Sequence, residues 1–371
     1  MNAADTFLAL ARFTAVPGST AARTWTDEAA RLSIDWNDLA EAAEHHGLEP
    51  LVLAHIREGG LAIPEPVLTR LRGRCAMHAH AGDVREAVAA RLHDAFDAGG
   101  VPCLLLKGAA LAQLVYPRAA LRPMRDLDLL IRGADRTRAR AVLARAGFEP
   151  GGAVIPPEHQ HGQPMHLAER GAIVTVELHH QLLRPTPLIA PLRYECLVPR
   201  AQPCRWGAAT FRTLAPEDML WHVYAHAFAI DVLNPAIRLI SVADLTHAVE
   251  HWVQDIDWDR LAAVYPRLWR ALAVLDVLTP WSSGVRQRLP RVRRTSLDGV
   301  GPLEPRRSWR QAFRREVVWP TDWWFRIRYG VDGPAAWLWY RAAGHPLRLA
   351  LAAADGIARR VRPHPVPAHD L

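Results

Sequence analysis

The chain has 371 residues, of which 50% are hydrophobic and 22% are charged. This length leaves room for two or three domains, and these proportions are ordinary for a soluble globular protein. The formal net charge of +7 permits contact with nucleic acid or an anionic membrane but requires neither. The four cysteines form no Cys-x-x-Cys pair, which excludes a zinc ribbon or a disulfide scaffold and predicts a protein of the reducing cytoplasm.

Neither a signal peptide nor a membrane span is expected. The N-terminal segment at 1–18 has no positively charged region ahead of its apolar stretch. The longest apolar candidate for a span, residues 334–358, is interrupted by Arg341, His345 and Arg348. A membrane-spanning helix needs roughly 20 predominantly apolar residues, and no stretch of the sequence provides them.

Residues 1–98 are predicted to be helical, because their apolar residues recur at three- and four-residue spacing. Helix starts are expected at Thr26 or Asp27 and again at Asp35, since threonine and aspartate are favoured N-cap residues. The sequence therefore predicts a helical N-terminal region.

The pattern changes at residue 101. A short apolar run at 101–106 predicts a buried strand, and residues 126–131 alternate polar and apolar side chains as a second strand does. A helix is predicted after each strand, and the second of these helices ends at Gly147. Two further segments flank Arg170-Gly171 and predict a hairpin. This order of elements indicates a compact α/β or α+β unit.

From residue 215 onward the apolar spacing is again helical. Residues 284–328 are rich in proline and arginine and poor in acids, which is typical of a solvated linker or of an arm that contacts an anionic partner; the linker is the favoured interpretation. The predicted regions are an N-terminal helical region at 1–98, an α/β core at 99–205, a C-terminal helical domain at 206–283, and an Arg/Pro/Trp-rich helical tail at 284–371.

Two aspartates, Asp126 and Asp128, stand two residues apart in the second predicted strand. Side chains alternate along a strand, so both carboxylates project from one face while Leu127 and Leu129 enter the core. Neighbouring carboxylates repel each other unless a cation lies between them, and a hard divalent ion such as Mg²⁺ prefers oxygen ligands. The alternative is an Asp-x-Asp pair on the solvated face of an edge strand, which is a common pattern.

A third acid, Glu177, lies in the predicted strand at 172–180, on the opposite register to Val176 and Leu178. If this strand pairs beside the strand of Asp126 and Asp128, the three carboxylates come together. Three carboxylates on adjacent strands can form a two-metal site for phosphoryl or nucleotidyl transfer.

Lys107 is the only lysine among the 45 basic residues of the chain. It comes at the end of the first predicted strand, directly before Gly108 and a helix predicted to begin at Ala109. The backbone N–H groups of a helix N-terminus favour anions, and a compact ammonium can follow a moving phosphate in a way that a planar guanidinium cannot. The alternative is that a single lysine remains here by drift.

Three arginines, Arg118, Arg122 and Arg125, lie in the connection that leads to the aspartates. One or two of them could hold a triphosphate through bidentate hydrogen bonds. Arg122 is the favoured candidate, and the others are the candidates for ordinary loop charges.

The histidines are weaker candidates. The pairs His222/His226 and His247/His251 have the helical spacing of a metal site but lack the glutamate of an HExxH motif, so core or capping roles are favoured. His179 shares a face with Glu177 and is the best secondary candidate, for orienting an acceptor or relaying a proton. Three more histidines, His159, His161 and His166, lie in the predicted hairpin and either line the acceptor side or belong to a surface loop.

The run KGAALAQLVYPRAALRPMRDLDLL, with GVPCLLL before it and VELHHQL after it, resembles the bacterial uncharacterised nucleotidyltransferase family, of the DNA polymerase β-like nucleotidyltransferase superfamily. The similarity also includes DWNDLAEAAEHHGLEPLVLAHI, APEDMLWHVYAHAF and IRLISVADL, and covers most of residues 30–280. The core motif is the specific part of this resemblance.

The resemblance implies an α+β fold, with a small mixed β-sheet that has helices on one face and helical regions on either side in the sequence. It places Gly108-Ala109 at the superfamily's Gly-Ser turn, Asp126 and Asp128 at its metal-binding pair, and Glu177 at its third acid. Two features depart from the pattern. Ala109 has no hydroxyl to offer a phosphate, a loss for which Lys107 can compensate, and the segment from the turn to the acid pair is longer than usual.

These observations predict a cytoplasmic nucleotidyltransferase that uses Mg²⁺ (or Mn²⁺) and moves a nucleoside monophosphate from a nucleoside triphosphate (NTP) to an acceptor hydroxyl or phosphate. Two alternatives stay open. One is a tailoring enzyme that transfers a phosphoryl or sugar unit to a peptide natural product, because members of the resembled family often lie near genes for such peptides. The other is an inactive module that binds nucleic acid or a phosphorylated ligand, consistent with the basic tail and Ala109.

Overall fold

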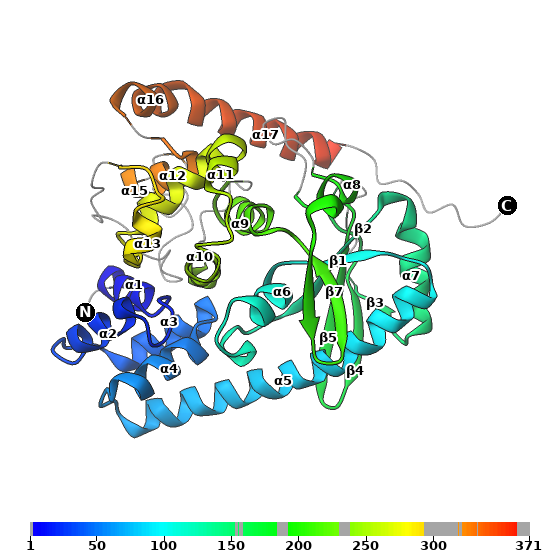
Figure 1. Cartoon of the computed structure of the whole chain (residues 1–371), viewed down its shortest axis with the longest axis horizontal. Coiled ribbons are helices and arrows are strands. Elements are labelled where there is room, and N and C mark those ends of the chain that lie inside the picture. The colour runs from blue at the N-terminus through cyan, green and yellow to red at the C-terminus, as the bar shows by residue number, and fades with distance from the viewer. Residues whose placement is uncertain are drawn as a thin grey trace.

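Figure 1 presents a computed structural model of the chain, which describes residues 3–152, 155, 159–183, 192–229, 238–292, 318, 321–331 and 333–361. Most of the basic stretch at 284–328 lies outside these residues, so its predicted role as a linker or an arm stays a prediction.

The N-terminal region is helical, as predicted. It consists of α1 (Ala3–Arg12), α2 (Thr20–Ala29), α3 (Trp36–His46), α4 (Glu49–Gly59) and the long α5 (Glu65–Ala98). Asp35 caps α3, because its side chain accepts hydrogen bonds from two backbone N–H groups of the first turn. The start expected at Thr26 or Asp27 is wrong. Ser19 is the N-cap of α2, and both residues lie inside that helix.

One mixed sheet of seven strands forms the centre of the α/β part. Its strands are β1 (Cys103–Leu105), β2 (Asp126–Ile131), β3 (Glu149–Pro150), β4 (Met165–Glu169), β5 (Ala172–His179), β6 (Gln202–Trp206) and β7 (Ala209–Thr213), in the order β3-β4-β5-β2-β1-β7-β6. β2 is antiparallel to β1 and parallel to β5, and β1 is parallel to β7. The predicted α+β class with a mixed sheet and flanking helices is confirmed.

The predicted hairpin joins β4 and β5. Its two turn residues, Arg170 and Gly171, have φ angles of 48° and 77°. Positive φ at both central residues is the geometry of a type I′ turn, whose twist matches that of the flanking strands. The turn fixes the register of β5, and therefore the position of Glu177.

A second hairpin, β6–β7, was not predicted. It turns at Gly207, which has a φ of 56°, and buries alternate side chains such as Trp206 and Phe211. β7 extends the sheet past residue 205, the predicted end of the core, because it pairs with β1. The division into four regions otherwise stays a prediction.

The remaining helices surround the sheet and continue the helical part. They are α6 (Lys107–Leu114), α7 (Arg136–Arg145), α8 (Tyr194–Leu197), α9 (Pro216–Tyr224), α10 (Leu239–His251), α11 (Trp258–Val264), α12 (Pro266–Leu275), α13 (Ser283–Arg286), α15 (Asp322–Tyr329), α16 (Pro334–Trp339) and α17 (His345–Val361). Figure 1 shows α5 running from the N-terminal helices to the sheet, and α1 near α10 and α13. The Thr14 and Thr279 hydroxyl oxygens lie 2.6 Å apart and join these two helical parts.

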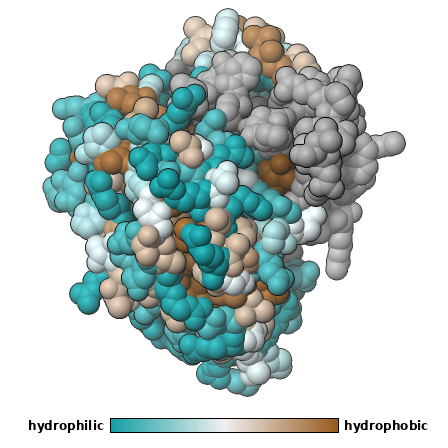
Figure 2. Space-filling view, turned by 90° about the vertical axis from the view of Figure 1, so that its right-hand side faces the viewer, coloured by the Kyte–Doolittle hydropathy of each residue, from teal (hydrophilic) through white to brown (hydrophobic). Residues whose placement is uncertain are grey.

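One continuous hydrophobic cluster includes side chains from α1 to α15 and from the sheet, so the helical parts and the sheet share a core. Figure 2 shows the side of the molecule at the right of Figure 1, where the coloured residues are mainly hydrophilic and the hydrophobic ones lie in small groups. Among the described helices, none combines the length and the apolar character needed to cross a membrane.

Candidate active site

The pairing of β2 with β5 brings the three predicted acids together. In the parallel register, Asp128 lies directly opposite Glu177, and Asp126 lies opposite Thr175. Leu127 and Leu129 are buried, as expected if the carboxylates between them project from the other face. The predicted adjacency of these two strands is confirmed.

A buried imidazole completes this acidic group. The Nε2 atom of His179 lies 2.8 Å from Oδ1 of Asp128 and 3.6 Å from Oε2 of Glu177. His179 is fully buried, and Asp128 is 3% exposed. On the outer side, Nε2 of His161 lies 3.5 Å from the same Glu177 oxygen. His179, which the sequence analysis proposed for the acceptor side, therefore lies directly against the acids.

Lys107 contacts the carboxylate of Asp128 as well. Its ammonium nitrogen lies 3.4 Å from Oδ1 of Asp128. α6 starts at Lys107 itself, directly after β1, and Lys107 has a φ of 43°. Left-handed backbone at a residue other than glycine is uncommon and costs free energy, so the surrounding structure must hold it. A glycine turn would suggest that Gly108 has the left-handed backbone, but in this structure the residue with that backbone is Lys107.

Gly108 is required for a different reason, which involves Arg122. A Cβ atom at Gly108 would lie 2.7 Å from Nη1 of Arg122. Arg122 in turn makes a bidentate ion pair with Asp244, through Nε at 2.9 Å and Nη2 at 2.7 Å. The Tyr116 hydroxyl donates to Asp244 as well, at 2.8 Å. Arg122 lines the site, but this pairing leaves less of its guanidinium for a phosphate than the sequence suggested.

The carboxylates differ in their electrostatics. Burial alone would raise the pKa of Asp128, but Lys107 and the hydrogen bond from His179 hold that pKa far below its usual range. Burial and the neighbouring carboxylates raise the pKa of Asp126, which outweighs the effect of Lys107. For Glu177, burial alone would raise the pKa, but the hydrogen bond from His179 and the nearby charges of His161 and His179 together lower it. The repulsion between the carboxylates therefore acts mainly on Asp126, the acid whose pKa is raised.

Two histidines that the sequence analysis assigned to the core lie beside this cluster. His222 is fully buried, and neither of its ring nitrogens has a hydrogen-bond partner among the residues that the structure describes. Lys107 first, and then burial, lower the pKa of His226 to about 3, so this imidazole is neutral. The spacing of the two histidines is visible in the sequence, but only the fold places the end of α9 and the turn after it (Ala225–Ala229) beside Lys107.

The acids open into a cavity of about 440 Å³, here called the acidic cavity. Its lining includes Lys107, Gly108, Arg122, Asp126, Asp128 and Glu177 on one side, and Glu44, Glu49, Arg74 and His78 from α3 to α5 on the other. Arg125 and Arg238 also line it, and neither has an acidic partner among the described residues. Burial lowers the pKa of Arg238, and the positive charges of Arg125 and Arg122 lower it further. This part of the cavity is suited to an anion.

The chemistry of the acidic cavity fits a divalent cation. Asp128, Glu177 and His179 each offer a ligand atom, and these atoms lie within 4.8 Å of one another. Asp126 is adjacent on β2, and burial first and then the negative charge of Asp128 raise its pKa, a repulsion that a cation would relieve. The site residues thus match the donor set of a metal site.

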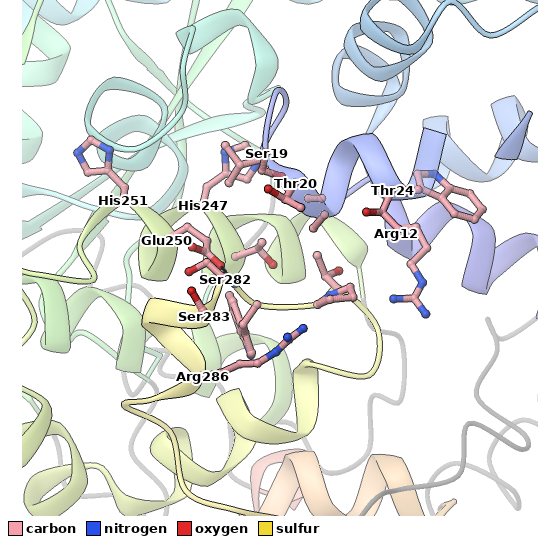
Figure 3. A pocket seen from close by; sticks show the side chains of 18 of the residues that line it. Arg12, Ser19, Thr20, Thr24, His247, Glu250, His251, Ser282, Ser283 and Arg286 are labelled. Carbon is pink, nitrogen blue, oxygen red and sulfur yellow. Dashed lines mark hydrogen bonds between the residues drawn. The ribbon is translucent and has the colours of Figure 1, made fainter. Parts of the chain in front are cut away.

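A second cavity of about 850 Å³, here called the α2–α10 cavity, lies on the far side of α6. Figure 3 shows Glu250, Ser282 and Ser283 on one side of it and Arg12 and Thr24 on the other. His247 also lines it, fully buried and stacked on Tyr116 at a ring-centroid distance of 4.1 Å, in agreement with the core role predicted for this residue. No predicted site residue lines this larger cavity.

A family model described as "Uncharacterised nucleotidyltransferase" matches residues 33–278. Among solved structures, a solution structure of the antibiotic-resistance factor ANT(2'')-Ia has 14% identity and a TM-score of 0.35, and covers 52% of this chain and 95% of its own. A crystal structure of ANT(2'')-Ia with adenylyl-2''-tobramycin has 14% identity and a TM-score of 0.34, and covers 50% and 96%. TM-scores this low establish no shared detail, and no curated protein matches.

Proposed function

Because this chain belongs to the uncharacterised nucleotidyltransferase family, we propose that it moves a nucleoside monophosphate from an NTP to an acceptor hydroxyl in the acidic cavity. The observation that carries this proposal is the register of β2 and β5, which sets Glu177 opposite Asp128 and beside Asp126. Three carboxylates on one face of adjacent strands suit a divalent-metal site, and Mg²⁺ or Mn²⁺ are the expected ions.

Asp126, Asp128 and Glu177 would hold the metal, which supplies electrostatic stabilisation of the phosphate oxygens when it is bound. Glu177 would also help to accept the proton of the acceptor hydroxyl, because its carboxylate lies at the more open edge of the cluster, next to His161. His179 holds both Asp128 and Glu177 in place through its Nε2 atom.

The triphosphate would bind at the basic part of the cavity. Lys107 would meet the β- and γ-phosphates, where negative charge develops on the leaving pyrophosphate. Arg125 and Arg238 supply two further guanidinium groups without acidic partners among the described residues. Arg122 would support the Lys107-Gly108-Ala109 turn from behind and present its remaining N–H groups to the phosphates.

The acceptor would enter from the side of α3 to α5, where Glu44, Glu49, Arg74 and His78 line the cavity. These helices precede the sheet in the sequence, so acceptor recognition would depend on the N-terminal region. A cytoplasmic location, which suits an NTP-dependent enzyme with four free cysteines, stays part of this proposal.

The test uses the full chain with each NTP, labelled in turn on the α- and the γ-phosphate, together with a divalent metal and a fractionated metabolite extract. Metal-dependent transfer of the α-label, with release of pyrophosphate and loss of both on Asp126→Asn, is the expected result. Transfer of the γ-label would instead identify a phosphotransferase. Metal-independent, salt-sensitive RNA binding without any transfer would support a binding module.

A further inference from the structure

His179 stands out among the residues that contact the carboxylates of the acidic cavity, because imidazole nitrogen is a different type of metal ligand from a carboxylate oxygen. We infer that His179 is a direct ligand of the metal, through Nε2, and that the set of Asp128, Glu177 and His179 favours a first-row transition metal ion over Mg²⁺. This inference rests on the metal site of the proposed function. It concerns which ion the site selects, and neither nucleotide nor acceptor enters its test.

The distances between the three donor atoms support a shared ion. The Nε2 atom of His179 is 2.8 Å from Oδ1 of Asp128 and 3.6 Å from Oε2 of Glu177. Ligands about 2.1 Å from one ion lie about 3.0 Å apart when they are octahedral neighbours and about 3.4 Å apart in a tetrahedral set. The two separations that involve Nε2 bracket these values, and all three donor atoms lie within 4.8 Å of one another.

The contacts of the Asp128 oxygen point the same way. Oδ1 of Asp128 receives both the His179 contact and the Lys107 ammonium, which lies 3.4 Å away. In the metal-free protein these two groups neutralise one carboxylate oxygen, and a doubly charged ion that binds there would displace the Nε2 proton of His179. Such an ion would take over the neutralising role of Lys107 and release its ammonium toward the phosphates.

The ring of His179 is fixed for this purpose. It is fully buried, and its position at the end of β5 is set by the pairing of that strand with β2. Its Nδ1 atom has no hydrogen-bond partner among the described residues, so no interaction there opposes the tautomer that carries the proton on Nδ1. When a metal displaces to solvent the Nε2 proton that His179 shares with Asp128, this tautomer presents the Nε2 lone pair to the ion.

Ligand chemistry then decides between ions. Mg²⁺ prefers oxygen ligands and keeps much of its hydration, whereas imidazole nitrogen suits ions such as Co²⁺, Fe²⁺ and Zn²⁺. Affinity for a site with nitrogen and oxygen donors rises from Mn²⁺ to Co²⁺ along the first row. A buried imidazole within reach of two carboxylates therefore shifts selectivity away from Mg²⁺.

The experiment measures binding of Co²⁺ and of Mg²⁺ to the metal-free full chain by calorimetry, with the visible spectrum of Co²⁺ as a second readout. His179→Gln is the informative variant, because the glutamine amide oxygen lies close to the position of Nε2 and replaces nitrogen by oxygen. We expect the protein to bind Co²⁺ more tightly than Mg²⁺. His179→Gln should lower the affinity for Co²⁺ by about tenfold or more and change the affinity for Mg²⁺ much less. His180→Gln, the next residue along the chain, is the matched control and should leave both affinities unchanged.

An equal loss for both ions in His179→Gln would mean that His179 only positions Asp128, and the inference would be overturned. It would also be overturned if Co²⁺ showed no saturable binding at millimolar concentration, or if His179→Gln left the Co²⁺ spectrum unchanged. Should His179→Gln fail to fold, pulsed electron paramagnetic resonance of Mn²⁺ bound to the unaltered chain still decides, since a nitrogen coupling supports ligation and its absence contradicts it. Nucleotidyl transfer is a separate readout. Metal selectivity with no transfer would reject the proposed function and keep this inference.

Discussion

The two cavities border opposite ends of α6 and differ in what lines them. The acidic cavity, at the Lys107 end, is about half the size of the α2–α10 cavity, at the Tyr116 end. No residue lines both. Chemistry concentrates in the smaller one, where three carboxylates, an ammonium and buried imidazoles come from several elements. The comparison teaches that convergent titratable groups, and not volume, mark the site.

The cavities are nevertheless connected through side chains. His247, on the wall of the α2–α10 cavity, stacks on Tyr116, whose hydroxyl donates to Asp244. Asp244 holds Arg122, which packs against Gly108 at the turn of Lys107. Variants at each end, and in this connection, can therefore separate the roles of the two cavities.

The largest effect is expected for Asp128→Asn. This change removes a charge from the buried acid that both His179 and Lys107 contact, and should lower nucleotidyl transfer by about a thousandfold or more. The rate of α-label transfer is the measurement. Glu250→Gln, a matched removal of one charge from the α2–α10 cavity, should keep nearly full activity. Comparable losses in both variants would erase the distinction between the cavities.

A smaller but still large effect is expected in the connection. Asp244→Asn leaves the Arg122 guanidinium without its bidentate partner in a nearly buried place, which should lower the free energy of unfolding by about 3 kcal/mol. Urea titration measures this loss. Tyr116→Phe removes only one hydrogen bond to the same carboxylate and should cost about 1 kcal/mol. If Asp244→Asn costs no more than Tyr116→Phe, the ion pair does not stabilise the connection.

The part of the acid sensitivity that His247 contributes tests the α2–α10 cavity. Burial first, and the neighbouring His55 second, lower the pKa of His247 to about 3. Below about pH 6.5 this histidine becomes protonated in the unfolded chain but stays neutral in the native state. The free energy of unfolding therefore falls as the pH drops from about 6.5 toward 3. For this one residue, the loss between pH 7 and pH 5 is about 2 kcal/mol.

The variant His247→Phe keeps a ring against Tyr116 and should remove that part of the pH dependence. Urea titrations at pH 7 and pH 5 measure the difference. An unchanged slope in the variant would show that His247 is already protonated in the folded protein, or that its ring is hydrated by the cavity. His251→Phe, on the exposed end of the same helix, is the control.

Much of the site could be predicted from the sequence, because strand alternation and turn residues within a few positions of each acid indicate where its side chain lies. The alternation around Asp126 and Asp128, and that around Glu177, fixes which face the carboxylates occupy, and the turn at Arg170-Gly171 fixes where β5 begins. The pairing of β2 with β5 was a conditional prediction, and the structure confirms it.

The misses are contacts between distant segments. Asp244 lies 122 residues from Arg122, and no local pattern announces their ion pair. The β6–β7 hairpin did have a readable alternation around Gly207, which the sequence analysis left unassigned. His222 is buried as its predicted core role requires, but no local pattern indicates that the fold also places His222 and His226 near Lys107 and Asp128.

The smallest expected effect concerns the single lysine. Lys107→Arg keeps the positive charge, so the free energy of unfolding should change little. However, the ammonium lies 3.4 Å from Asp128 in a place where the lysine side chain is only 18% exposed, and its backbone is already in the left-handed region. A planar guanidinium is larger and cannot pivot from the carboxylate to a phosphate in the same space, so kcat/KM should fall about tenfold. Arg125→Lys is the matched reverse change at an exposed cavity position and should cost less. An equal or smaller loss for Lys107→Arg would mean that charge alone matters at the turn, and would favour drift as the reason for the lone lysine.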